Sequence, residues 1–107
     1  MSMIEEIDAT ELHTRLASDE NIRLIDVRSV EEFGQGMIQG GELMPLHTVP
    51  LKINELSNDV TNIIYCRSGM RSAQACMFLA EQAGIKAINL RGGIIAWGQS
   101  GFTITHP

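Results

Sequence analysis

A cysteine and two arginines lie close together in the segment CRSGMR, residues 66–71. Cys66 follows an apolar run, and a helical pattern begins a few residues later. The first turn of a helix exposes unpaired N–H groups and a partial positive charge, which bind anions and stabilise thiolates. Arg67 and Arg71 add positive charge, so we predict that the pKa of Cys66 lies below its usual value of ~8.5. The segment therefore predicts a nucleophilic cysteine in a loop that binds an anion.

Gly69 and two serines give this loop further means of holding an anion. A glycine adopts backbone conformations that other residues avoid, so successive N–H groups can turn toward one point. Ser68 can donate a hydroxyl to that point, and Ser72 can do the same or cap the following helix. The alternative is a buried cysteine in an ordinary turn. Because cysteine, glycine, spaced arginine and helix start occur together, we favour the reactive thiol.

The surrounding sequence predicts alternating strands and helices. Apolar and β-branched runs predict strands, while Asp or Ser followed three residues later by Glu predicts two helix starts. The expected strands lie near residues 3–7, 21–27, within 41–46, 61–66 and 86–90. The expected helices lie at residues 8–17, 29–36, 47–56, 72–83 and within 92–101. Pro50 weakens the third of these helices. The alternation predicts an α/β fold with a mostly parallel sheet covered by helices on both faces.

This fold class predicts where the site lies. Ligands of open parallel sheets bind beyond the carboxyl ends of the strands. Asp26 and Arg28 leave one such end, Cys66 a second and Arg91 a third. We expect Asp26 and Arg28 to form ion pairs or cap bonds that support the loop, and Arg91 to be a solvated charge. The sequence thus predicts a local positive site for a small anion on an acidic protein.

The composition excludes several other classes of function. The 107 residues carry a formal net charge of -5, which disfavours binding to nucleic acids and anionic membranes. No apolar run reaches the roughly 18 residues of a membrane span, and we expect one domain over residues 1–107. The start MSMIEEIDAT lacks the pattern of a secretory signal and only two cysteines occur, so we expect a cytoplasmic protein. Without CxxC or HxxxH spacing, we expect no metal ion and no cofactor.

Cys76, the second cysteine, is predicted to be structural. It lies in the helix after the loop, roughly 9 Å along the axis at 1.5 Å per residue. That separation is too large for an easy disulfide with Cys66. Cys76 also shares helical spacing with Ala73, Met77 and Ala80, a pattern that predicts one buried stripe. We therefore expect a core residue and not a second redox thiol.

Four segments of the chain resemble the rhodanese family of thiosulfate sulfurtransferases. The CRSGMR loop resembles the active-site loop of that family, in which cysteine and arginine have the spacing C-x4-R. The other segments, in matching order, are LIDVR (24–28), EEFGQGMIQGG with MPL (31–41 and 44–46) and GGIIAWGQSGF (92–102). The resemblance implies a single-domain rhodanese with a five-stranded parallel sheet. At Met37 the chain departs from the family, which commonly has histidine there, and we expect changed packing with little loss of catalysis.

The resemblance implies sulfur transfer by double displacement. The Cys66 thiolate would attack the outer sulfur of thiosulfate, release sulfite and become a persulfide, whose sulfur would pass to cyanide or a thiol. The residues implied in donor binding are Arg67, Ser68, Gly69, Met70 and Arg71. The residues implied in support are Asp26, Arg28 and Ser72. No separate general base is expected, because a lowered thiolate pKa already provides the nucleophile.

Other functions stay open at this stage. The chain could be a persulfide carrier that acts with a protein donor or acceptor, with thiosulfate activity incidental. It could be a regulatory module of the same family, although such modules often lack the cysteine. Phosphatases and arsenate reductases use a C-x5-R loop, one residue longer, and the shorter loop here favours a single sulfur. The physiological donor and acceptor, and the choice between monomer and homodimer, stay open too.

Overall fold

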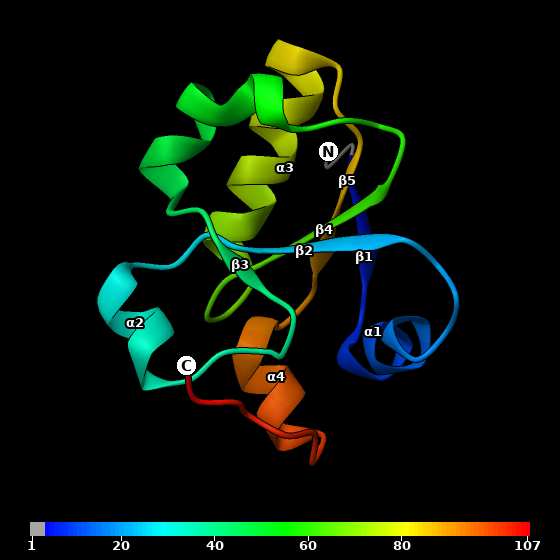
Figure 1. Ribbon diagram of the computed structural model, residues 1–107, viewed down its shortest axis with the longest axis vertical. Coiled ribbons are helices and arrows are strands. Elements are labelled where there is room, and N and C mark those ends of the chain that lie inside the picture. The colour runs from blue at the N-terminus through cyan, green and yellow to red at the C-terminus, as the bar shows by residue number, and fades with distance from the viewer. Residues whose placement is uncertain (1–3) are drawn as a thin grey trace.

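Strands and helices alternate along the chain, as the sequence predicts (Figure 1). The computed structural model describes residues 4–107, so residue 3 of the first expected strand lies outside the described residues. The strands are β1 (Glu5–Ile7), β2 (Ile22–Asp26), β3 (Glu42–Leu43), β4 (Thr61–Tyr65) and β5 (Ala87–Leu90). The helices are α1 (Ala9–Leu16), α2 (Val30–Gln35), α3 (Met70–Ala83) and α4 (Gly93–Gln99), with the 3-10 helix η1 (Leu46–Glu55). The predicted α/β fold class is confirmed.

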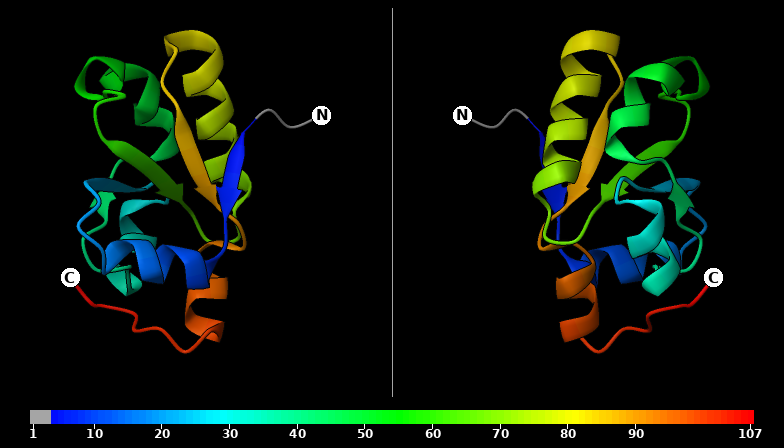
Figure 2. Two further views of the ribbon diagram at one scale, coloured as in Figure 1. Left: turned by 90° about the vertical axis from the view of Figure 1, so that its right-hand side faces the viewer. Right: turned by 90° about the vertical axis from the view of Figure 1, so that its left-hand side faces the viewer.

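All five strands form one parallel sheet in the order β1-β5-β4-β2-β3. The central strand β4 places Ile63 between Leu24 of β2 and Ile88 of β5. The first strand pairs with the last, and Figure 2 shows β1 and β5 side by side. Cys66 therefore leaves the carboxyl end of the most central strand, where ligands of parallel sheets bind.

Each face of the sheet packs against helices through its own apolar core. Side chains alternate along β4, so Ile64 belongs to the core beneath α3 and η1, and Ile63 to the core beneath α1 and α4. The helices of the two layers lie on opposite sides of the sheet in Figure 1. Within residues 4–107, no helix is both long enough and apolar enough to cross a membrane.

Two predicted helix starts carry the side-chain caps that their sequences indicate. Ser29 and Glu32 form both hydrogen bonds of a capping box at α2. Asp8 accepts a hydrogen bond of 2.8 Å from the N–H of Glu11 at α1. The region after Pro45 is a 3-10 helix with a kink at Lys52, because Pro50 cannot donate the hydrogen bond of a regular α-helix.

Helix α3 differs from the prediction in its start and in its buried face. It begins at Met70, with Gly69 as N-cap, and not at residue 72. Its buried residues are Ser72, Ala75, Cys76 and Leu79, whereas Met77 of the expected stripe is 41% exposed. The spacing of apolar residues does not identify Ser72 as part of the buried face, because serine is polar. Ser72 is buried with its hydroxyl in contact with the Cys66 sulfur.

Candidate functional site

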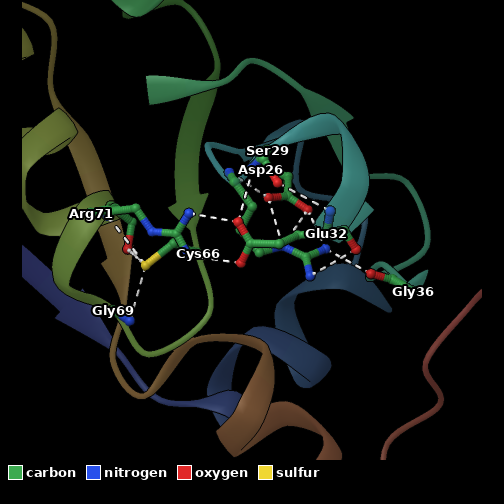
Figure 3. A network of polar contacts seen from close by, with 9 residues as sticks. Asp26, Ser29, Glu32, Gly36, Cys66, Gly69 and Arg71 are labelled. Carbon is green, nitrogen blue, oxygen red and sulfur yellow. Dashed lines mark hydrogen bonds and ion pairs between the residues drawn. The ribbon is translucent and has the colours of Figure 1, made fainter. Parts of the chain in front are cut away.

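The Cys66 sulfur lies in a ring of hydrogen-bond donors at the start of α3 (Figure 3). Its side chain is buried directly after β4. The sulfur accepts hydrogen bonds from the N–H of Gly69 at 3.1 Å and from the N–H and hydroxyl of Ser72, both at 3.4 Å. Gly69 has a φ of 103°, a left-handed conformation that glycine adopts readily and that aims its N–H at the sulfur. This arrangement holds a negatively charged sulfur.

The pKa of Cys66 is lowered by the balance of two opposing effects. Burial is the largest single effect and raises the pKa, because an apolar surrounding disfavours the thiolate. Hydrogen bonds from the hydroxyl and N–H of Ser72, and from the N–H groups of Gly69 and Ser68, outweigh it. The backbone N–H groups of the loop and one hydroxyl thus lower the pKa of the thiol. The sequence pattern instead predicts that the two arginines lower it directly.

Arg71 is held by the carboxylate of Glu32, for which the sequence pattern predicts only a role in capping a helix. Its Nη1 and Nη2 donate to Oε1 and Oε2 of Glu32 at 2.8 and 2.9 Å. The bond to Arg71 lowers the pKa of Glu32 to about 2, so the carboxylate is ionised at neutral pH. The hydrogen bond to Glu32 is the largest effect that raises the pKa of Arg71, and the nearby Cys66 thiolate adds to it. Glu32 therefore ties α2 to the first turn of α3.

Asp26 and Arg28 form the expected ion pair, and both side chains are almost fully buried. Arg28 Nη2 donates to Asp26 Oδ2 at 2.6 Å and to the carbonyl of Gly36 at 2.7 Å. Arg28 Nη1 also donates to the carbonyl of Glu32 at 3.3 Å. The pair thus joins the end of β2 to the third residue and the C-cap of α2, which holds the helix that carries Glu32.

The segment after β5 supports the loop from behind. The N–H groups of Ile94 and Ile95 donate to the carbonyls of Cys66 and Arg67 at 2.9 and 3.2 Å. Gly93 has a φ of 60°, and a Cβ there would lie 2.4 Å from the carbonyl oxygen of Arg67. Asn89 Nδ2 donates to the carbonyl of Gly69 at 3.2 Å. The double glycine is the sequence signal for this contact, because only glycine allows so close an approach.

Two hollows open beside the loop at the mouth of the site. One has a volume of about 480 Å³. It is lined by Arg28, Glu32, Gln35, Gly36, Arg67, Ile94, Ile95, Gly98, Gln99 and Ile104. The other, of about 330 Å³, is lined in part by Val30, His47 and Arg71. His47 is distant from Cys66 in sequence, so the fold alone brings a histidine to the mouth. Ser68 is exposed and the Met70 side chain is 73% exposed, and of these two residues Ser68 affects the Cys66 sulfur, through its backbone N–H.

The site is less positive than its arginines predict. Arg28 and Arg71 are paired with Asp26 and Glu32. Arg91 reaches Asp8 at 4.0 Å, and both side chains are well exposed. Within residues 4–107, Arg67 is the arginine of the loop with no carboxylate partner. The expected positive cluster is thus mostly neutralised, by the expected local partner Asp26 of Arg28 and by Glu32, which lies 39 residues from Arg71 in the sequence.

Cys76 and Met37 both occupy structural positions. Cys76 is buried in the core with α3 and, like Cys66, is a free cysteine. Burial raises the pKa of its thiol to about 12, so it is inert at neutral pH. Met37 is buried and exchanges backbone hydrogen bonds of 2.7 and 2.8 Å with Thr105. It therefore anchors the C-terminal segment.

Comparisons with known proteins agree with this fold. Residues 8–100 match the model of the rhodanese-like domain family. A sulfurtransferase from Allochromatium vinosum is 45% identical over 105 residues, which cover 98% of each chain. A putative sulfur carrier protein from Bacillus subtilis is 34% identical over 96 residues, which cover 90% of this chain and 52% of that protein. A crystal structure of a rhodanese-like domain protein from Staphylococcus aureus has a TM-score of 0.84 at 34% identity, covering 95% of this chain and 99% of that one. The chain therefore belongs to the rhodanese-like domain family.

Proposed function

We propose that the protein is a sulfurtransferase that carries sulfane sulfur as a persulfide on Cys66. Sulfurtransferase activity is supported at the level of the family by the related sulfurtransferase. The observation that carries the proposal is the Cys66 sulfur, which accepts hydrogen bonds from Gly69 and Ser72 while its pKa is lowered. Because these hydrogen bonds favour the thiolate, the thiol ionises more readily and the proposed reaction needs no separate base.

The first half-reaction of the proposed cycle uses thiosulfate as the donor. The Cys66 thiolate attacks the outer sulfur, a bond forms between the two sulfurs, and the bond from outer sulfur to the sulfonate sulfur breaks. The electron pair of that bond leaves with sulfite, and Cys66 becomes a persulfide anion. The N–H groups of Gly69 and Ser72, which donate to the Cys66 sulfur, stabilise the charge of the transferred sulfur. Arg67, the loop arginine without a carboxylate partner in residues 4–107, attracts the sulfonate end of the donor, and Arg71 contributes less because Glu32 pairs with it.

In the second half-reaction an acceptor removes the transferred sulfur. Cyanide or a thiolate attacks the outer sulfur of the persulfide, and the electron pair of the broken S–S bond returns to Cys66 as thiolate. Cyanide then leaves as thiocyanate, and a thiol acceptor leaves as a persulfide. No oxidant or reductant is consumed over the cycle. Asp26 and Arg28 support both steps by holding α2 against the loop.

The test is intact-mass spectrometry after brief incubation with thiosulfate, with Cys66→Ser as control. We expect the unaltered protein to gain one sulfur atom, to lose it to cyanide and to form thiocyanate. The serine variant should gain none. Since Cys76 is buried with a pKa of about 12, sulfur uptake in the serine variant would contradict the assignment to Cys66.

A persulfide carrier that acts with protein partners is the second candidate. It is favoured by the likeness to the putative sulfur carrier protein from Bacillus subtilis. In this case a persulfidated donor protein loads Cys66 much faster than thiosulfate does. Loading rates from the two donors at equal concentration separate the candidates, and no loading from either donor rejects both.

A further inference from the structure

A buried asparagine occupies the interior of β5, where an apolar side chain is expected. Asn89 is 1% exposed and lies between Glu6 of β1 and Ile64 of β4 in the sheet. Asparagine is depleted in strands, and a buried amide is destabilising unless its hydrogen bonds are made. Within residues 4–107 the Oδ1 atom of Asn89 has no hydrogen-bond partner. The stability of the sheet alone therefore favours an apolar residue at this position.

The Nδ2 group of Asn89 joins the edge of the sheet to the reactive loop. It donates to Oε2 of Glu6 at 2.7 Å and to the carbonyl oxygen of Gly69 at 3.2 Å. A carboxylate and a carbonyl both accept hydrogen bonds, so these two neighbours fix which end of the amide faces the loop. The nitrogen of the amide thus holds the N-cap residue of α3.

The contact with Asn89 limits the movement of Gly69, a residue type with more backbone freedom than any other. The N–H of Gly69 donates to the Cys66 sulfur at 3.1 Å, a shorter distance than the two bonds of 3.4 Å from Ser72 (Figure 3). The Gly69 carbonyl also accepts the N–H of Ala73 at 3.1 Å. Because φ and ψ join the N–H and the carbonyl of one residue, a carbonyl held by two donors restricts the direction of that N–H.

We propose that Asn89 is a positioning residue of the reaction, whose amide holds the carbonyl of Gly69 and so keeps the N–H of Gly69 directed at the Cys66 sulfur. This inference rests on the proposed function and adds a residue outside the loop to it. Glu6 orients the amide from the edge strand β1. The bond between Glu6 and Asn89 spans 83 residues of sequence, so the pattern of the loop segment does not reveal it.

Asn62 on the neighbouring strand β4 is the matched control. It is 2% exposed, and its Oδ1 also lacks a hydrogen-bond partner among the described residues 4–107. Its Nδ2 donates to the carbonyls of Ser57 and Lys86 at 2.9 and 3.5 Å. Asn62 precedes Cys66 by four residues, or about 13 Å at 3.3 Å per residue. A substitution there removes a similar amide without altering the loop.

The experiment compares the pH profile of Cys66 alkylation by iodoacetamide in Asn89→Leu and in Asn62→Leu. Leucine has nearly the shape of asparagine, donates no hydrogen bond and removes the unpaired oxygen at both positions. In Asn89→Leu the midpoint should rise by about 0.5–1 unit, a part of the shift expected for loss of one hydrogen bond to a charged group. In Asn62→Leu the midpoint should match that of the unaltered protein.

The alkylation rate at high pH separates positioning from general damage to the loop. Above both midpoints, Asn89→Leu should react at least as fast as the unaltered protein, because a thiolate with a higher pKa is the stronger nucleophile. A rate that is lower at every pH would show a blocked thiol and overturn the inference. Urea denaturation checks that the variants fold. Should either leucine variant fail to fold, Asn89→Ala and Asn62→Ala replace the pair, with the same directions expected.

Equal midpoints in the variants of Asn89 and Asn62 also overturn the inference, because a positioning role predicts a shift at residue 89 alone. Alkylation needs no sulfur transfer, so the comparison of midpoints does not depend on persulfide formation. A protein that gains sulfur from no donor refutes the proposed function separately, whatever the two midpoints are.

Discussion

At the scale of single residues, Ser72 explains how a buried thiol becomes acidic. It is fully buried on the core face of α3, where an apolar residue would ordinarily lie. Its hydroxyl and its N–H both donate to the Cys66 sulfur. These bonds favour the thiolate against the burial that opposes it.

We predict that Ser72→Ala raises the pKa of Cys66, because the thiolate loses a hydroxyl donor while its burial is unchanged. Sulfur loading at neutral pH should fall by about tenfold or more, as expected for loss of one hydrogen bond to a charged group. The pH profile of Cys66 alkylation by iodoacetamide measures this directly, and its midpoint should move to higher pH.

Ser68→Ala is the control for that prediction. Ser68 is exposed, and its effect on the Cys66 pKa comes through its backbone N–H, which alanine retains. Its midpoint should match that of the unaltered protein. Equal shifts in the two variants would show that loop disturbance, and not the Ser72 hydroxyl, sets the pKa.

At the scale of elements, the turn between β5 and α4 sets the shape of the reactive loop. Gly93 packs against the carbonyl of Arg67, and the next two N–H groups bind the loop carbonyls. Gly84, at the C-terminal end of α3, has a similar φ of 64° but open space around it. Substitution of Gly84 therefore tests backbone strain alone, whereas substitution of Gly93 tests strain together with the contact to the loop.

We predict that Gly93→Ala is much more harmful than Gly84→Ala. A left-handed alanine costs about 1–2 kcal/mol, which is the whole effect expected at residue 84. At residue 93 the overlap with Arg67 adds to this, and the free energy of unfolding should fall by about 2–5 kcal/mol. Urea denaturation measures both values.

Gly93→Ala should also shift the pH profile of Cys66 alkylation upward, because the loop N–H groups move away from the sulfur. Gly84→Ala should leave the profile in place. If the two variants lose equal stability and share one profile, the contact with Arg67 does not shape the loop.

At the scale of the whole molecule, local sequence patterns predict the features that neighbouring residues determine. The alternation of strands and helices, the cap at Ser29 and the glycine turn after Cys66 are set by neighbouring residues, and the structure agrees with them. The neighbours in the sheet are not local, because β1 pairs with β5 across nearly the whole chain. Apolar spacing carries no information on such pairs.

The difference between local and distant contacts also explains why the site carries less positive charge than its arginines predict. Counting arginines near Cys66 predicts a positive cluster, but a carboxylate distant in the sequence pairs with Arg71. Glu32 lies 39 residues from Arg71 in sequence, and His47 reaches the mouth only through the fold of η1. Local sequence patterns therefore predict the nucleophile and its hydrogen-bond donors better than the charges that surround them.

The support of the loop by Gly93, Ile94 and Ile95 has a consequence for synthesis of the protein. A ribosome adds about 5–20 residues per second, so Cys66 leaves it before the segment that completes its surroundings. We expect the nascent thiol to titrate like a free cysteine until β5 and α4 dock.

Chains stalled on the ribosome, with a linker that carries Cys66 beyond the exit tunnel, test this through the pH midpoint of labelling of the thiol. The midpoint should fall only when residues beyond 99 have emerged, and an early fall would show that the loop forms unaided. Because the thiol becomes acidic only after this segment has folded, the growing chain reacts less with cellular electrophiles.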